Sequence, residues 1–250
     1  MNSNLKLILK IIVPSAIFII IILLLRGVHF DWNTFPRLAC QLNGNCNDCE
    51  KDLDGSFVHE IVNTLSNVIY IIVGFYIYFK YTSLSKFYRG IILFGFCAIA
   101  IGSTFYHSST SLPGIVSDFI GINILLTCLS YVVFRIKFKS KELTLGLLGI
   151  FISGFILLTV NFPENDLIKY IATGLISGIL ILSLFKYLLQ RNMIIAVILY
   201  LLGVICWQID GRRIFCDPLS ILQFHSLWHI CVALAGLFIV REVVRLGKGE

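Results

Sequence analysis

Charged residues are scarce in this chain of 250 residues: only 14% are Asp, Glu, Lys or Arg, against about 25% in an ordinary soluble domain. Hydrophobic residues make up 58%, and the mean hydropathy is +0.90. So little charge argues against a soluble domain. The composition indicates an all-α integral membrane protein, because helices satisfy their own backbone groups inside lipid.

The chain also lacks the marks of two other classes of protein. No small-x-small cleavage pattern precedes Arg26, so the first apolar run, 7–25, is interpreted as a retained anchor rather than a secretory signal. The net charge is +6, but the basic residues fall in short loops at alternate helix ends, which does not support a nucleic-acid partner. We find no internal repeat or low-complexity tract.

Apolar runs long enough to cross a bilayer recur along the sequence. About 20 helical residues cross about 30 Å of hydrocarbon. The runs predict helices near 7–25, 61–79, 89–108, 117–135, 143–160, 167–187, 193–208 and 224–243. The basic loops lie on one side of these helices, which places both termini in the cytoplasm. We therefore divide the chain into an anchor (1–26), an extracytoplasmic acidic, cysteine-bearing segment (27–60) and a membrane domain (61–245).

Five polar side chains within these helices require an explanation, because polar groups are costly in the bilayer. The topology places all of them at one depth near the extracytoplasmic face: Ser103, His107, Asp118, His225 and His229. His225 and His229 are four residues apart, so both imidazoles leave one face of a helix. Three histidines with one open position suit a catalytic zinc ion. Hydrogen-bonded interhelical histidines are the alternative.

The segment before the second helix gathers carboxylates: Asp48, Glu50, Asp52, Asp54 and Glu60. Oxygen ligands of this kind suit Ca²⁺, but the spacing does not fit an EF-hand loop, and a solvated acidic loop is the alternative. His29 and His59 lie in the same segment. We expect these two histidines to be solvated or interfacial.

These motifs resemble the alkaline ceramidases, which are membrane hydrolases in a superfamily that also contains adiponectin-receptor-like proteins. The resemblance covers about residues 47–243. It is carried by Cys49-Glu50, Glu60-x-x-Asn63-Thr64-x-Ser66-Asn67, Gly102-Ser103-x-x-x-His107, Asp118 and His225-x-x-Trp228-His229. The fold that it implies is a seven-transmembrane-helix bundle, to which 7–25 adds one N-terminal transmembrane helix.

The resemblance also implies roles for particular residues. His107, His225 and His229 would bind Zn²⁺, with Ser103 and Asp118 as catalytic residues. The reaction would be hydrolysis of a ceramide-like amide to a sphingoid base and a fatty acid. The implied Ca²⁺ ligands are Asp48, Glu50, Asp52 and Glu60, although the family's Asp-Trp before Cys-Glu is Asn47-Asp48 here.

Four cysteines fall on the outer face, where disulfides are permitted: Cys40, Cys46, Cys49 and Cys216. The resemblance favours a Cys49–Cys216 link, and Cys40–Cys46 is a local candidate. The other four cysteines are expected to be small buried hydrophobes, with zinc ligation as the alternative: Cys97, Cys128, Cys206 and Cys231.

A site among helices near the interface predicts a lipid substrate that enters from the bilayer. The sequence leaves three other functions open. One is a zinc-dependent hydrolase of another lipid amide or ester. The second is an adiponectin-receptor-like receptor with the same zinc site, and the third is a zinc-binding membrane protein without enzymatic activity.

Overall fold

The computed structural model describes residues 3–35, 48–53, 55–138, 149, 154, 157 and 166–247. Its regular structure within these ranges is helical, apart from one isolated bridge between His29 and Ser56. The longer helices are α1 (Ser3–Arg26), α4 (Val68–Lys80), α5 (Lys86–Ser109), α6 (Leu112–Phe138), α8 (Asp166–Leu184), α9 (Arg191–Gly211) and α10 (Phe224–Gly247). The shorter ones are η1 (Trp32–Thr34), α3 (Ile61–Ser66) and η2 (Phe185–Tyr187).

Six stretches of the described helices are long and apolar enough to cross a membrane: Asn4–Arg26, Ile61–Lys80, Lys86–Ser109, Leu112–Ile136, Arg191–Gly211 and Phe224–Gly247. Helix α8 includes a shorter apolar stretch, Thr173–Tyr187. These helices are those of a multi-pass membrane protein. The helix predicted at 143–160 lies outside the described residues, so a count of seven helices plus an anchor stays a prediction.

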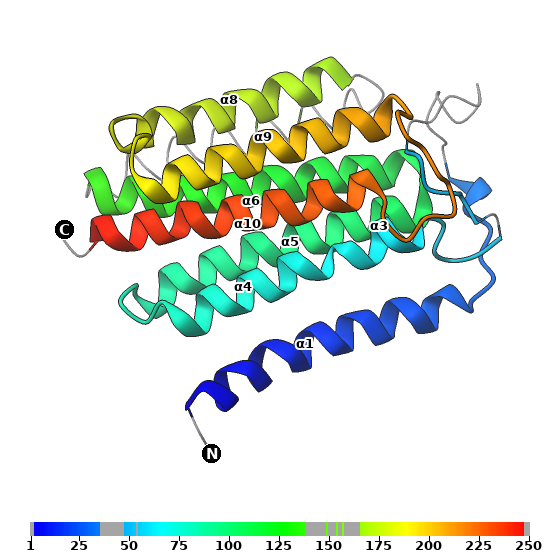
Figure 1. Ribbon diagram of the computed structural model, residues 1–250, viewed down its shortest axis with the longest axis horizontal. Helices are drawn as coiled ribbons and strands as arrows, with labels where there is room; N and C mark the ends of the chain where they lie inside the picture. The colour runs from blue at the N-terminus through cyan, green and yellow to red at the C-terminus, as the bar shows by residue number, and fades with distance from the viewer. Residues whose placement is uncertain are drawn as a thin grey trace.

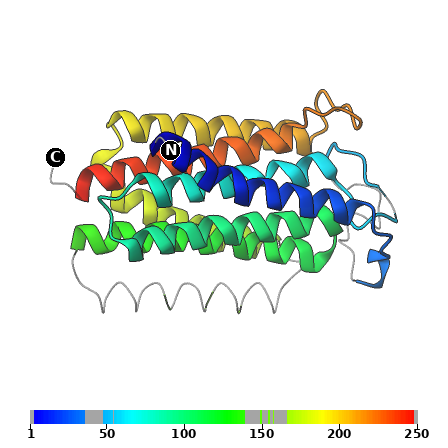
Figure 2. The same ribbon diagram turned by 90° about the horizontal axis from the view of Figure 1, so that it is seen from below.

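The long helices run roughly side by side, and both termini lie at the same end of the bundle (Figure 1). Helix α10 lies at the centre and contacts α3, α4, α6 and α9, while α1 packs on the outside against α3 and α4 (Figures 1 and 2). The bundle core is aliphatic and aromatic, with Tyr70, Ile77 and Phe96 fully buried. The loops at the end away from the termini carry the polar residues described below.

Close packing of α5 against α6 depends on two glycines. A Cβ atom on Gly102 would overlap the backbone oxygen of Ser117, and one on Gly121 would lie 2.8 Å from the backbone oxygen of Ala98. Small residues let two helix backbones approach closely in a membrane. Gly102 thereby brings Ser103, the next residue, beside the α6 backbone at Asp118.

Helix α6 begins five residues before its predicted start at 117. The Ser111 hydroxyl accepts a hydrogen bond from the Gly114 N–H at 3.2 Å, and Pro113 occupies the first turn, where its missing N–H costs nothing. These two residues start the helix early. Asp118 therefore lies in the second turn of α6 and does not open the helix as expected.

Candidate metal centre

Three imidazoles from two distant stretches of the chain meet at the end of the bundle. The ring centroids of His107 and His225 are 4.7 Å apart, those of His225 and His229 are 4.8 Å apart, and those of His107 and His229 are 5.1 Å apart. All three side chains are buried. One nitrogen from each lies within 4.8 Å of the others, so the group could hold a single metal ion.

The helices account for this meeting. His107 lies in the last turn of α5, one turn after Ser103, whereas His225 and His229 occupy the first two turns of α10. Residues four apart on a helix share a face, so His225 and His229 both point toward α5. The spacing that was read from the sequence thus describes the local part of the site correctly.

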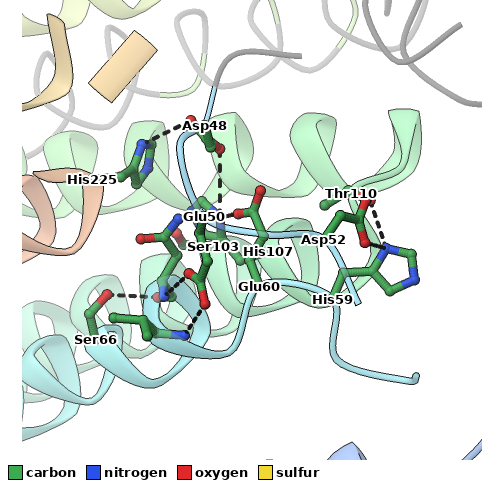
Figure 3. Close-up of polar contacts among 12 residues, drawn as sticks. Asp48, Glu50, Asp52, His59, Glu60, Ser66, Ser103, His107, Thr110 and His225 are labelled. Carbon is green, nitrogen blue, oxygen red and sulfur yellow. Dashed lines mark hydrogen bonds and ion pairs between the residues drawn. The ribbon is translucent and has the colours of Figure 1, made fainter. Parts of the chain in front are cut away.

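Two of the imidazoles have carboxylate partners at Nδ1. His107 Nδ1 lies 2.5 Å from Glu60 Oε2, which also accepts a hydrogen bond from Asn63 Nδ2 at 3.2 Å. His225 Nδ1 lies 3.2 Å from Asp48 Oδ1, as Figure 3 shows. The Glu60 contact occupies Nδ1 of His107 and leaves its Nε2 as the atom that could bind a metal, whereas Nδ1 of His225 has no hydrogen-bond partner among the described residues.

The third imidazole is held in the same way by a hydroxyl. His229 Nδ1 lies 2.6 Å from Ser66 Oγ, and Ser66 also donates to the backbone oxygen of Asn63 at 2.6 Å. His229 Nε2 lies 3.4 Å from Ser103 Oγ, while His107 Nε2 is buried and has no hydrogen-bond partner among the described residues. A buried ring nitrogen of this kind is costly unless something binds it. The donor set therefore fits a zinc ion.

Ser103 and Asp118 lie beside the three imidazoles. The Asp118 carboxylate interacts with the Ser103 hydroxyl and electrostatically with His225, and Ser103 Oγ lies 3.4 Å from Nε2 of His229. Both residues come from the α5–α6 pair that the glycine contacts bring together. A carboxylate and a hydroxyl thus stand next to the position that a metal would occupy.

The predicted calcium ligands are divided among different partners. The Glu50 carboxylate accepts hydrogen bonds from the backbone N–H groups of Val62 at 2.6 Å and Asn63 at 2.8 Å. It thereby caps the start of α3, where a negative charge is stabilised. Asp48 and Glu60 instead form a possible metal-binding group with His107.

Asp52 takes part in a separate contact, to one side of His107 and His225 (Figure 3). Its Oδ1 lies 2.8 Å from His59 Nδ1, which is also 2.9 Å from the Thr110 hydroxyl. His59 is buried, so the expectation that it is solvated or interfacial was wrong. Backbone hydrogen bonds from His59 and Glu60 to the end of α5 draw it inward, a pairing that local sequence does not reveal.

The carboxylates around the site concentrate negative charge. Burial raises the pKa of Glu60 well above its usual range, and the carboxylates of Asp48 and Glu50 raise it further. Burial also raises the pKa of Glu50. Burial has the largest effect on Asp48 and opposes its ionisation, but the charge and hydrogen bond of His225 lower the pKa of Asp48 to about 2. Such a cluster favours a bound cation.

Sequence reasoning missed Asp210, which lies at the end of α9. Its Oδ2 accepts a hydrogen bond from the Cys49 N–H at 3.0 Å, and its Oδ1 accepts one from the His225 N–H at 3.2 Å. Together with Asp48 and His225 it forms a further group that could hold a metal ion. Its only sequence signal was a carboxylate near the end of an apolar helix.

A disulfide between Cys49 and Cys216 joins the acidic segment to the loop before α10, with Cα atoms 5.5 Å apart. The resemblance predicted this link, and the structure contains it. Cys40 and Cys46 lie outside the described residues. Among the described cysteines, four are free: Cys97, Cys128, Cys206 and Cys231. Cys128 is buried and the others are partly buried.

Comparison with known protein families agrees with this geometry. The sequence profile of the Ceramidase family matches residues 43–246, which is most of the chain. The protein therefore belongs to the ceramidase family. A search of curated proteins finds no match to the chain.

Proposed function

We propose that this protein is a zinc-dependent amide hydrolase that cleaves ceramide or a related N-acyl lipid, within the membrane, to a sphingoid base and a fatty acid. The observation that supports this function most directly is the set of three buried imidazoles that could hold one metal ion, two of them hydrogen-bonded at Nδ1 to an oxygen atom, in a member of the ceramidase family. The family supplies the reaction class, and the geometry supplies the residues.

In this proposal His107, His225 and His229 hold the zinc ion. A zinc ion bound there would act as a Lewis acid toward the amide carbonyl and would make a water molecule nucleophilic near neutral pH. Hydrogen bonds at Nδ1 to Glu60 and Ser66 orient the rings of His107 and His229, as the partners of metal-ligating histidines do, and Asp48 lies 3.2 Å from Nδ1 of His225.

Asp118 and Ser103 carry out the proton transfer and charge stabilisation. The Asp118 carboxylate takes a proton from the attacking water and delivers it to the amide nitrogen as the carbon–nitrogen bond breaks. The Ser103 hydroxyl, which interacts with Asp118, donates to the carbonyl oxygen as negative charge develops there. The water oxygen is retained in the fatty acid, and the amine leaves with the proton.

The orientation in the membrane is also a proposal. Basic residues in alternate loops support cytoplasmic termini and a site near the extracytoplasmic or lumenal face. The same proposal keeps the division into an anchor (1–26), an acidic outer segment (27–60) and a hydrolase domain (61–245). A substrate that enters laterally from the bilayer suits a site among helices.

The function is tested with the purified full-length protein in lipid nanodiscs. We expect equal amounts of fatty acid and sphingoid base to be released from ceramide, as measured by mass spectrometry, with turnover lost on chelation and restored by Zn²⁺. A panel of other N-acyl lipids and lipid esters defines the substrate class. A protein that retains zinc but releases product from none of these lipids would contradict the proposal and favour a receptor-like role.

Asp118→Asn tests the assignment of the proton carrier. We expect turnover to fall by about 10²–10⁴-fold while zinc content stays that of the wild type, because an amide cannot accept the proton. Turnover and bound zinc are measured on the same preparation. Wild-type turnover in Asp118→Asn would remove this residue from the mechanism.

A further inference from the structure

The loop between α9 and α10, residues 212–223, exposes an unusual amount of apolar side chain. The exposed fractions are 85% for Phe215, 78% for Leu219, 83% for Ile221 and 72% for Leu222. Single exposed apolar residues are common on protein surfaces. Four strongly exposed apolar side chains within eight residues are unusual, and exposed apolar patches mark surfaces that contact something other than water. We call these four residues the apolar loop patch.

The polar groups of this loop are satisfied internally. The buried side chain of Gln223 donates from Nε2 to the backbone oxygens of Asp217 at 3.1 Å and Ser220 at 2.8 Å. The Leu222 N–H donates to Ser220 Oγ at 3.0 Å, and the Leu219 N–H donates to Asp217 Oδ1 at 3.1 Å. The loop thus satisfies these polar atoms internally and exposes apolar side chains together with the charged side chains of Arg212, Arg213 and Asp217, a mixture that suits the interface of a bilayer rather than its hydrocarbon core.

The loop is also fixed to the rest of the protein. Cys216 is linked to Cys49 by the disulfide, and the Lys51 N–H donates to the backbone oxygen of Pro218 at 3.0 Å. In Figure 2 the loop, in orange, projects from the side of the bundle at the end away from the termini. A held loop can present its apolar patch in one direction.

The flanking helices indicate which surroundings the apolar loop patch contacts. Both α9 and α10 are candidate membrane spans, so the loop that joins them lies at a membrane surface. Trp207 in the last turns of α9 and Trp228 near the start of α10 lie with ring centroids 6.1 Å apart, and tryptophan is enriched at the headgroup level of bilayers. Arg212, which is exposed at the start of the loop, offers a positive charge to lipid phosphates.

We propose that the apolar loop patch inserts into the interfacial layer of the bilayer and anchors the site end of the bundle there. His225 follows Leu222 by three residues, so the anchor sets the depth of the candidate site. In a ceramide the amide joins the fatty acyl chain to the sphingoid base beside its hydroxyl groups and therefore lies at the same boundary. This last consequence rests on the proposed function, whereas lipid contact by the loop does not.

Photo-crosslinking in nanodiscs tests the contact. The full chain carries Leu219→benzoylphenylalanine and, as a matched control, Lys51→benzoylphenylalanine at an exposed polar position that touches the same loop. After irradiation, mass spectrometry is expected to find lipid adducts at position 219 at several times the yield at position 51. Equal yields, no adduct at 219, or a cross-link to a second copy would each overturn the proposal.

A kinetic test addresses the consequence for substrate. We expect the Leu219→Ser, Ile221→Ser double variant to raise KM several-fold for ceramide in vesicles while leaving kcat unchanged, and to leave turnover of a short-chain, micelle-dispersed substrate unchanged. A lower kcat with unchanged KM would overturn the link between anchoring and substrate. Lipid adducts in a protein with no hydrolase activity would refute the proposed function but support the insertion of the apolar loop patch into the bilayer.

Discussion

The pair of helices α9 and α10 buries one carboxylate at each end, and the two are satisfied in different ways. At the site end, Asp210 is 1% exposed and accepts hydrogen bonds from the backbone N–H groups of Cys49 and His225. At the opposite end, Glu242 is fully buried and accepts from the side chains of Asn192 at 3.1 Å and Arg245 at 2.5 Å.

Glu242 and Asp210 differ in the groups to which they bond. Glu242 bonds to a cation on its own helix and to an amide on α9, so its charge is compensated and the two helices are joined. The partners of Asp210 are neutral backbone groups, one beside a disulfide and one on a candidate metal ligand. We infer that the site end is organised for cation binding, whereas the opposite end serves stability.

Removing a ligand gives the largest expected effect. His225→Ala should lower turnover by on the order of 10³-fold or more and remove the bound zinc, because two imidazoles do not complete the donor set. Elemental analysis and product release are measured together. Glu242→Gln, on the same helix, serves as the control and should retain zinc. Full zinc content in His225→Ala would contradict the inference that the site end binds the metal through His225.

Asp210→Asn sharpens the comparison by testing a residue that acts through backbone position. An asparagine NH₂ group cannot accept one of the two N–H bonds, so His225 should be less well placed and zinc affinity should fall by about 10–100-fold. The measurement is a titration against a competing chelator. As the control, Asp217→Asn changes an exposed carboxylate in the loop between α9 and α10 and should leave the zinc affinity unchanged. Equal affinities in the two variants would reduce Asp210 to a structural residue.

Glu242→Ala tests the opposite end. Losing the carboxylate leaves the Asn192 amide unsatisfied and Arg245 without its counter-ion, so we expect unfolding to become easier by about 1–3 kcal/mol. Thermal unfolding in detergent gives this change. At a temperature where the variant remains folded, kcat and zinc content should equal those of the wild type. A selective loss of zinc would contradict the division between the two ends.

Calcium is expected to give the smallest effect. If Asp48, Glu50, Asp52 and Glu60 hold Ca²⁺, adding the ion should raise the Tm of the wild type, and Glu60→Ala should abolish that rise. Thermal scans with and without Ca²⁺, at fixed zinc, measure the shift. An identical rise of the Tm in Glu60→Ala would show that Glu60 is not a calcium ligand. If Ca²⁺ raises the Tm of neither protein, the proposed calcium site is contradicted.

The helices and the family could be predicted because their signals are local. Hydrophobic run length and the four-residue spacing of His225 and His229 reflect helix geometry alone, and seven of the eight predicted helices correspond to described helices, with α3 and α4 as one. The family prediction was confirmed by the profile match. The early start of α6 was missed because a hydroxyl and a proline after a polar turn were not read as a helix start.

The partners of the carboxylates could not be predicted in the same way. The resemblance assigned Asp48 and Glu60 to calcium, but their contacts in the structure are with His225 and His107. Asp210 was not assigned at all. A carboxylate accepts from any donor within reach, and the Cys49 N–H that donates to Asp210 is 161 residues away along the chain.

By itself the sequence determined the membrane environment and the family, since these follow from composition, helical period and motif. Only the tertiary structure decided which oxygen atom faces which imidazole nitrogen, and that the loop before α10 presents apolar side chains outward. Hydrogen bonds operate over about 3 Å, so their pairing depends on how helices pack, and no spacing along the chain encodes it.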